Sequence, residues 1–199
     1  MHSLQDFMIS RVRVKIMELF FSNTEEMYYV REITRSTKEE INAVRRELDR
    51  MIGSGMLKSE KRGNRLYYYL NKKYTYFPEL LRMVAKTTGI GLKMRKLRRK
   101  LGDISYLMFS GEFVNGQAPK RDQVDILVIG KLVLPELGLL IKEQEKKIGR
   151  EINYTVFDEE EFEFRKTRRD PFIMDILYGT RVMVIGGEED FCKREIPGI

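Results

Sequence analysis

The sequence is poor in the residues that most often build metal and redox centres. It contains one cysteine, Cys192, and one histidine, His2. A single cysteine excludes a disulfide within the chain, and these two side chains are too few for a zinc site made of thiolates and imidazoles. The sequence therefore predicts no metal site and no cofactor, and it predicts that Cys192 is an ordinary thiol.

Long apolar runs are absent as well. A membrane-spanning helix needs about 20 consecutive apolar residues, and no window of the chain approaches that length. The N-terminus has no basic start followed by an apolar core, which a secretory signal would have. We therefore expect a cytoplasmic protein without a membrane partner.

Charge is unevenly distributed along the chain. Residues 1–100 contain 23 Lys and Arg against 11 Asp and Glu, a net +12, whereas residues 101–199 contain 14 against 19, a net −5. A basic half joined to a mildly acidic half indicates a polyanion-binding module fused to a second module. The length of 199 residues allows two small domains, each with its own core.

Residues 41–52 have the spacing of an amphipathic helix. Apolar residues recur every three or four positions, at Ile41, Val44, Leu48 and Met51. The opposite, water-facing side carries Asn42, Arg45, Arg46 and Asp49. Asn and Arg side chains can each make two parallel hydrogen bonds to a base edge, Asn to adenine and Arg to guanine. This face is therefore a candidate for reading DNA.

A basic hairpin is predicted directly after this helix. Gly63 and Asn64 suit a tight turn with positive φ, and the apolar and aromatic residues 67–70 suit a returning strand. Three cations flank the turn, namely Lys61, Arg62 and Arg65.

The order of helix, turn, helix and basic hairpin resembles the winged helix of ArsR-like repressors of bacteria and archaea, over roughly the first 75 residues. An apolar stripe fits the first helix of that fold and comprises Ile9, Val12, Ile16, Leu19 and Phe20. The resemblance implies binding to double-stranded DNA, with residues 41–52 in the major groove. The expected DNA contacts are Lys38, Asn42, Arg45, Arg46, Lys61, Arg62, Asn64 and Arg65.

Two carboxylates depart from the pattern of that family. Glu39 and Glu40 stand where these repressors usually have Ser or Thr at the start of the reading helix. They suit the positive end of the helix dipole, but a carboxylate there would repel a DNA phosphate.

Residues 76–91 are predicted to form a linking helix, with Pro78 near its first turn and Gly89 and Gly91 at its end. One face of it is apolar, through Leu80, Leu81, Met83 and Val84. In many dimeric winged-helix proteins the helix after the wing packs against its twin, so this face is the leading candidate for a homodimer contact. The basic residues 93–100 are interpreted either as a phosphate contact or, more simply, as a solvated helix face.

The second half contains two strand-like segments, residues 104–109 and 124–130, with Ser110 and Gly111 breaking the pattern after the first. This order resembles the minimal nucleotidyltransferase fold. In that fold a Gly-Ser turn contacts nucleotide phosphates, and a strand opening with Asp-x-Asp holds magnesium ions. A third strand at residues 149–157 extends the resemblance, which covers residues 92 to about 190.

The site implied by this resemblance is degenerate. It comprises Gly111, Glu112, Gly116, Gln123 and Asp125. Glu112 replaces the phosphate-contacting serine, and Gln123 replaces the first aspartate, which leaves Asp125 as the remaining metal ligand. Asp122 would face the other side of the strand, and residues 152–157 contain no carboxylate. The resemblance therefore implies a scaffold without catalytic residues and without a metal ion.

Three functions remain open on these observations. The preferred one is a DNA-binding transcriptional regulator whose non-catalytic second domain senses a small-molecule or protein effector or assembles the dimer. The alternatives are an active nucleotidyltransferase targeted by its winged helix, and an antitoxin-like protein that represses its own operon. The preferred reading predicts an α+β fold, with a winged helix at residues 1–75, a linking helix at 76–91 and a nucleotidyltransferase-like α/β domain at 92–199.

Overall fold

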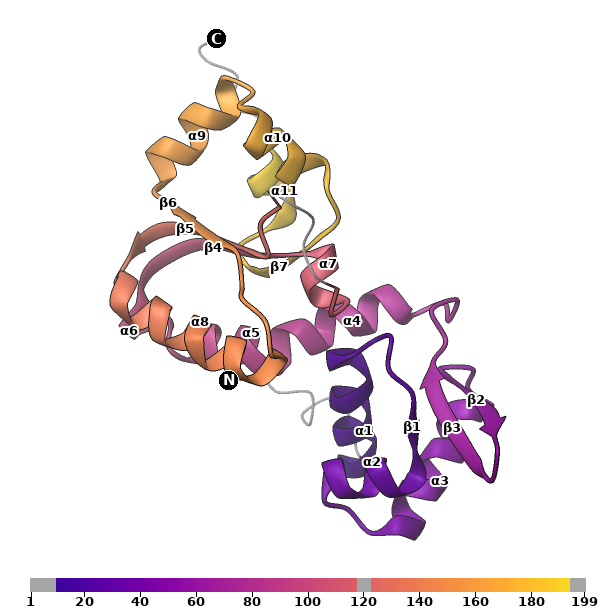
Figure 1. The fold of residues 1–199 in the computed structure, drawn as a ribbon. Helices are drawn as coiled ribbons and strands as arrows, with labels where there is room; N and C mark the ends of the chain where they lie inside the picture. Colours follow the sequence, from indigo (N-terminus) through magenta and orange to yellow (C-terminus); the bar gives the residue numbers. More distant parts are fainter. Residues whose placement is uncertain (1–9, 118–122, 194–199) are drawn as a thin grey trace. The chain divides into compact units, whose positions relative to one another are not determined.

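The structure, a computed structural model, describes residues 10–117 and 123–193 of the chain. The fold is mixed α+β with two separate sheets, which confirms the expected α+β class. The chain divides into two compact units, Met1–Thr88 and Gly89–Ile199 (Figure 1). Among the described residues, no helix combines the length and apolarity needed to cross a membrane.

The division between the units changes how the charge is assigned. Residues 89–100 carry six of the basic side chains and belong to the second unit. The first unit therefore has 17 Lys and Arg against 11 Asp and Glu, a net +6, and the second has 20 against 19, a net +1. The positive excess of the first 100 residues is thus shared between both units.

The first unit is built from helices around one small sheet. Its elements in chain order are α1 (Arg11–Ser22), β1 (Tyr28–Tyr29), α2 (Val30–Thr37), α3 (Ile41–Gly53), β2 (Leu57–Arg62), β3 (Arg65–Leu70) and α4 (Phe77–Thr87). Ser10 caps α1 by accepting a hydrogen bond from the backbone N–H of Arg13 at 3.2 Å. The helix α1 packs against α2, α3 and α4, and its Ile16, Met17 and Phe20 are fully buried.

The apolar stripe expected for this first helix is only partly correct. Ile16 and Phe20 are buried as expected, but Val12 and Leu19 are half-buried, and Met17 takes a core position instead. The face turned toward the core is rotated because α1 has three helices to contact. Ile9 lies outside the described residues.

The predicted hairpin is present. β2 and β3 pair in antiparallel register from Leu57 with Leu70 to Arg62 with Arg65, and β1 joins the other edge of β3. Gly63 at the tip has φ +56, a left-handed conformation that glycine adopts without strain.

The helix α4 begins with Pro78 in its first turn, as expected, and ends at Thr87. It packs against α1, and its Leu81 and Val84 are buried. The rings of Phe21 and Phe77 lie 5.6 Å apart. The apolar face that suggested a dimer contact is therefore largely used within the first unit.

The second unit is a sheet with helices on both faces (Figure 1). Its elements are α5 (Gly89–Lys96), α6 (Arg98–Leu101), β4 (Gly102–Ser110), α7 (Gly111–Val114), β5 (Ile126–Leu132), α8 (Leu134–Ile148), β6 (Tyr154–Phe157), α9 (Glu159–Thr167), α10 (Pro171–Tyr178), β7 (Arg181–Ile185) and α11 (Glu188–Cys192). The strand order is β6-β5-β4-β7, in which only β5 and β6 run parallel.

Burial of β5 on both faces explains the layered arrangement. Each of its residues from Ile126 to Gly130 is buried, so helices must cover both sides of the sheet. On one side α9, α10 and α11 bring Phe162, Ile173 and Phe191 into a common core. On the other side lie α5, α6 and α8 (Figure 1).

Two sequence expectations for this unit are corrected. The third strand begins at Tyr154 and not at residue 149 or 152, because Gly149 ends α8 in a left-handed conformation with φ +72. The basic segment is not one helix, since Leu97 separates α5 from α6. Its Lys93 pairs with Glu143 of α8, so at least one of the six cations has a structural partner.

Candidate functional site

The first candidate site is the water-facing side of α3. Asn42, Arg45 and Arg46 are exposed, whereas Val44 and Leu48 on the opposite side are fully buried. The predicted division of this helix into two faces is therefore confirmed. Its three planar polar side chains project from a rigid helix, which is the geometry that direct reading of base edges requires.

The carboxylates before α3 have structural partners. Glu40 caps the helix by accepting hydrogen bonds from the backbone N–H groups of Asn42 and Ala43, both at 2.9 Å, and these bonds hold the pKa of Glu40 below its usual value. Glu39 pairs with Lys15 at 2.6 Å and with Arg11 at 3.1 Å. The hydrogen bond from Lys15 is the main cause of the lowered pKa of Glu39. Both carboxylates thus serve the fold at this helix end.

Lys38 occupies the turn between α2 and α3. It is exposed, and its φ of +54 is a left-handed conformation that is uncommon for lysine. The turn therefore presents a cation immediately before the start of α3.

A buried carboxylate on α3 was missed from the sequence. Glu47 is 4% exposed and accepts hydrogen bonds from Ser10 at 3.0 Å, Arg13 at 2.9 Å and Arg50 at 2.7 Å. Its spacing gives a signal, because position 47 lies three residues after Val44 and so falls on the apolar face. These contacts tie α3 to the start of α1 and fix the orientation of the exposed face.

The hairpin tip gathers the predicted basic residues. Lys61, Arg62, Asn64 and Arg65 are all exposed. Arg62 pairs with Glu60 at 3.1 Å, and the guanidinium of Arg65 lies 4.6 Å from the centre of the Tyr29 ring. Two of the three cations at the tip therefore have partners within the hairpin sheet, whereas Lys61 has none among the described residues.

The second candidate site lies where β4 ends and β5 begins. Gly111 follows β4, and a Cβ added there would lie 2.0 Å from Oγ1 of Thr180. Its N–H donates to the carbonyl of Thr180 at 2.8 Å. The position therefore requires glycine because Thr180 packs against it, and its N–H is not available to a phosphate. Gly116, with φ +73, closes the short helix α7.

Asp125 has an internal cation as its partner. Its side chain is fully buried, and both of its oxygens accept hydrogen bonds from Arg150, at 2.8 and 3.0 Å. The same guanidinium donates to the carbonyls of Gln117 and Glu151. Arg150 was not recognised from the sequence, because 25 residues separate it from Asp125 and no local pattern links them.

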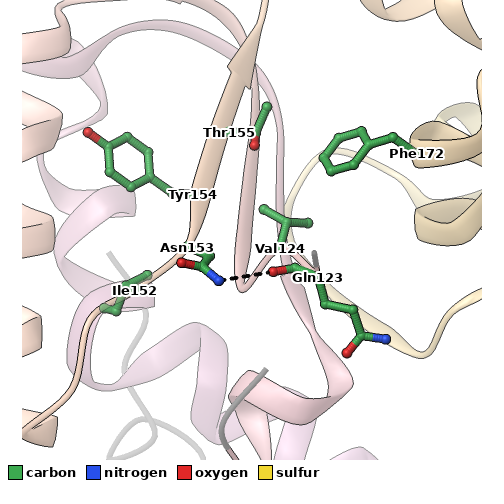
Figure 2. Close-up of a pocket in the computed structure, with 7 residues that line it drawn as sticks. All are labelled: Gln123, Val124, Ile152, Asn153, Tyr154, Thr155 and Phe172. Atoms are coloured by element: carbon green, nitrogen blue, oxygen red, sulfur yellow. Dashed lines mark hydrogen bonds between the residues drawn. The ribbon is translucent and has the colours of Figure 1, made fainter. Parts of the chain in front are cut away.

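Glu112 and Gln123 line an open cleft beside this ion pair. One part of it, about 380 Å³, is lined by Gln123, Val124, Ile152, Asn153, Tyr154, Thr155 and Phe172 (Figure 2). Asn153 Nδ2 donates to the backbone carbonyl of Gln123 at 3.3 Å. An adjoining part of about 90 Å³ shares Gln123, Val124 and Phe172, and adds Glu112 and Asp175.

The lining of the cleft decides which ligands suit it. It offers amide and hydroxyl groups, the ring of Phe172 and two carboxylates, and none of its described lining residues is Lys, Arg or His. Such a lining favours neutral or cationic small molecules and disfavours phosphates. Asp122 lies outside the described residues. Within the described residues, no three His, Cys, Asp or Glu side chains are grouped to hold a metal ion.

Comparisons with known proteins are sparse. No family model and no curated relative matches the chain. One solved structure that matches is human N-acetylserotonin methyltransferase in complex with SAM. The match covers 48% of this chain and 32% of the methyltransferase chain, at 16% sequence identity and a TM-score of 0.30. The chain thus spans about a third of that protein's length, and a similarity at this level carries no argument about fold or function.

Proposed function

We propose that the protein is a transcriptional regulator whose first unit is a winged helix that binds duplex DNA. The observation that carries the proposal is the exposed Asn42, Arg45 and Arg46 face of α3, held on a helix whose other face is buried. Side chains of this type make bidentate hydrogen bonds to adenine and guanine in the major groove.

The hairpin supports the same proposal. In a winged helix the β2–β3 tip lies against the DNA backbone, and this tip presents Lys61, Arg62 and Arg65 to solvent. In this proposal α3 reads the base edges and the hairpin tip contacts the phosphates, so different elements carry out the two tasks. The pairing of Glu39 with Lys15 also removes most of the repulsion that an unpaired carboxylate would exert on a nearby phosphate.

For the second unit we propose a nucleotidyltransferase-like scaffold without catalytic activity. Its residues do not fit a two-magnesium centre, because Asp125 is fully buried and both of its oxygens are engaged by Arg150. The guanidinium of Arg150 thus occupies the place beside Asp125 that a magnesium ion would need. Glu112 would in addition repel a nucleotide phosphate by a few kcal/mol at intermediate dielectric.

The cleft beside this ion pair is the proposed effector site. Its lining of amides, hydroxyls and carboxylates suits a neutral or cationic small molecule. In that arrangement the second unit senses the effector and the first unit binds the operator.

The proposal is tested by selecting DNA sites from a random duplex library with the full chain. We expect a reproducible enriched motif of the length that one or two reading helices cover, with binding that weakens steeply as salt rises. Recovery of no common motif after several rounds would contradict sequence-specific regulation.

The non-catalytic assignment of the second unit is tested separately. Incubation of the protein with labelled nucleoside triphosphates, magnesium or manganese and cell extract should label no acceptor. Label that disappears in Asp125→Ala would contradict the non-catalytic assignment.

A further inference from the structure

The sheet of the first unit has a face that α3 does not use and that shares Arg62 and Arg65 with the hairpin tip. Residues directly opposite each other in antiparallel strands point to the same side, and the register pairs Tyr29 with Tyr67 and Lys58 with Tyr69. Tyr67 and Tyr69 are two residues apart on β3 and so share that side. Tyr68, between them, points to the helices and is 5% exposed. We call the side with Tyr29, Tyr67 and Tyr69 the tyrosine face.

The three rings of the tyrosine face form a platform. β3 is the central strand of the sheet (Figure 1). Tyr67 and Tyr69 therefore lie on the strand between β1 and β2. All three tyrosines are only half-buried. The rings of Tyr29 and Tyr67 lie 5.7 Å apart in an edge-to-face arrangement. Along β3, side chains two residues apart are separated by roughly 6.6 Å, a spacing over which successive bases of an extended strand can each meet a ring.

The polar residues of the tyrosine face give it a positive excess. Lys58, Arg62 and Arg65 share it with one acid, Glu60. Glu60 is neutralised by Arg62, which leaves Lys58 and Arg65 as the excess charge. A hydrogen bond with Tyr67 is the main cause of the raised pKa of Arg65, and this bond and the contact with the Tyr29 ring hold the guanidinium against the tyrosine face.

We propose that the tyrosine face binds an unpaired nucleic-acid strand, with bases stacked on Tyr67 and Tyr69 and phosphates near Lys58 and Arg65. Aromatic rings interleaved with cations are the combination that single strands require, because every base has a stacking face and every linkage has a negative charge. Duplex DNA is a poor occupant because its bases are already stacked on one another and unavailable to the rings. This site is separate from the duplex-reading face of α3 and goes beyond the proposed regulation.

The test uses the full chain and three labelled oligonucleotides of equal length: oligo-dT, oligo-U and an abasic strand with phosphates but no bases. Affinity is measured by fluorescence anisotropy at fixed salt. Binding is also followed by quenching of tyrosine emission, which is directly observable because the protein has no tryptophan. Oligo-dT and oligo-U distinguish DNA from RNA as the source of the strand.

Substitutions of the tyrosines distinguish the contribution of base stacking to the affinity from the contribution of charge, because some of them remove the aromatic ring and others keep it. Tyr67→Thr removes the ring but puts a strand-favouring β-branched residue in its place, and it should weaken binding of the preferred strand about 5- to 150-fold, while Tyr67→Phe keeps the affinity. Tyr69→Thr should act in the same direction and gives a second measurement if Tyr67→Thr fails to fold, as judged by circular dichroism. Tyr76→Thr is the matched control, since Tyr76 is 60% exposed outside the sheet, and it should leave affinity unchanged.

Specific outcomes decide the proposal. The abasic strand should bind at least about tenfold more weakly than the strand with bases, because it offers nothing to stack. Equal binding of the abasic strand, or unchanged affinity in both Tyr67→Thr and Tyr69→Thr, would overturn the tyrosine-face site. Arg45→Ala should leave single-strand affinity intact. If the wild-type chain selects a duplex motif but binds none of the single strands, this site alone is overturned and the proposed regulation stands.

Discussion

Two buried carboxylates, one in each unit, are paired with arginines. Asp125 is fully buried and bonded through both oxygens to Arg150, which is itself a quarter exposed. Glu47 is bonded to Arg13 and Arg50, which reach the surface. Removing the arginine partner of a buried carboxylate leaves an uncompensated charge, which costs more than the pair contributes in net terms.

Arg150→Met should therefore lower the free energy of unfolding by about 3 kcal/mol. This value is at the low end of the losses seen when a buried ion pair is broken, because Arg150 is partly solvated. Urea unfolding followed by circular dichroism measures the loss. The double variant Arg150→Met with Asp125→Asn should be less destabilised than Arg150→Met alone, since asparagine carries no charge to leave unpaired. Additive losses in the double variant would show that the two side chains are not coupled.

The Glu47 network predicts a pH-dependent stability. Burial raises the pKa of Glu47, but hydrogen bonds from Arg13, Ser10 and Arg50 outweigh it, so the folded pKa lies below the ordinary 4.5. The carboxylate therefore stabilises the fold above that ordinary value, and the stabilisation is lost as pH falls through the folded pKa. Glu47→Gln should cost about 1–2 kcal/mol at pH 7, and the cost should disappear in acid.

The control for Glu47 is Glu60→Gln, in which an exposed pair with Arg62 is lost. Exposed pairs contribute little, so this change should stay within about 0.5 kcal/mol at every pH. If Glu47→Gln destabilises the protein equally at pH 3 and pH 7, the ionised carboxylate is not the source of the stability.

At the scale of elements, sequence patterns that span a few residues correctly predicted the structural features that depend on those few residues. The two faces of α3 and the β2–β3 hairpin were correct, because helical spacing and a Gly-Asn turn act over a few residues. The helix α8 was not predicted; only its Leu137 and Ile141 are fully buried, so its apolar spacing is weak. The contact between Asp125 and Arg150 depends on how α8 returns the chain to the start of β5, which no local pattern contains.

The junction of β4 and α7 offers a prediction about its glycine. Gly111→Ala should lower the free energy of unfolding by about 1–3 kcal/mol, because the added Cβ meets Oγ1 of Thr180 at 2.0 Å. Adding Thr180→Ala should restore part of the loss. Gly138→Ala in α8 is the matched control, since no atom lies within 4 Å of its added Cβ, and it should be neutral or stabilising by up to about 1 kcal/mol. Equal losses at both glycines would contradict the packing explanation.

At the scale of the whole molecule, one reading helix covers few base pairs. We therefore expect a two-fold dimer that reads an inverted repeat, with half-sites about one helical turn or a multiple of it apart. Because Leu81 and Val84 of α4 are buried against α1, the dimer contact must use surface other than these two side chains. Light scattering that shows a monomer at micromolar concentration, bound to a single half-site, would contradict this expectation.

The central claim is that α3 reads DNA bases, and the most direct test is the affinity of Arg45→Ala for the enriched duplex and for a scrambled duplex. We predict a loss of about 1–3 kcal/mol on the enriched site and little change on the scrambled one, so that discrimination between them falls. Arg82→Ala on α4, which also removes one exposed cation, should leave discrimination unchanged. If Arg45→Ala binds the enriched site as tightly as wild type, α3 does not read the DNA through this face.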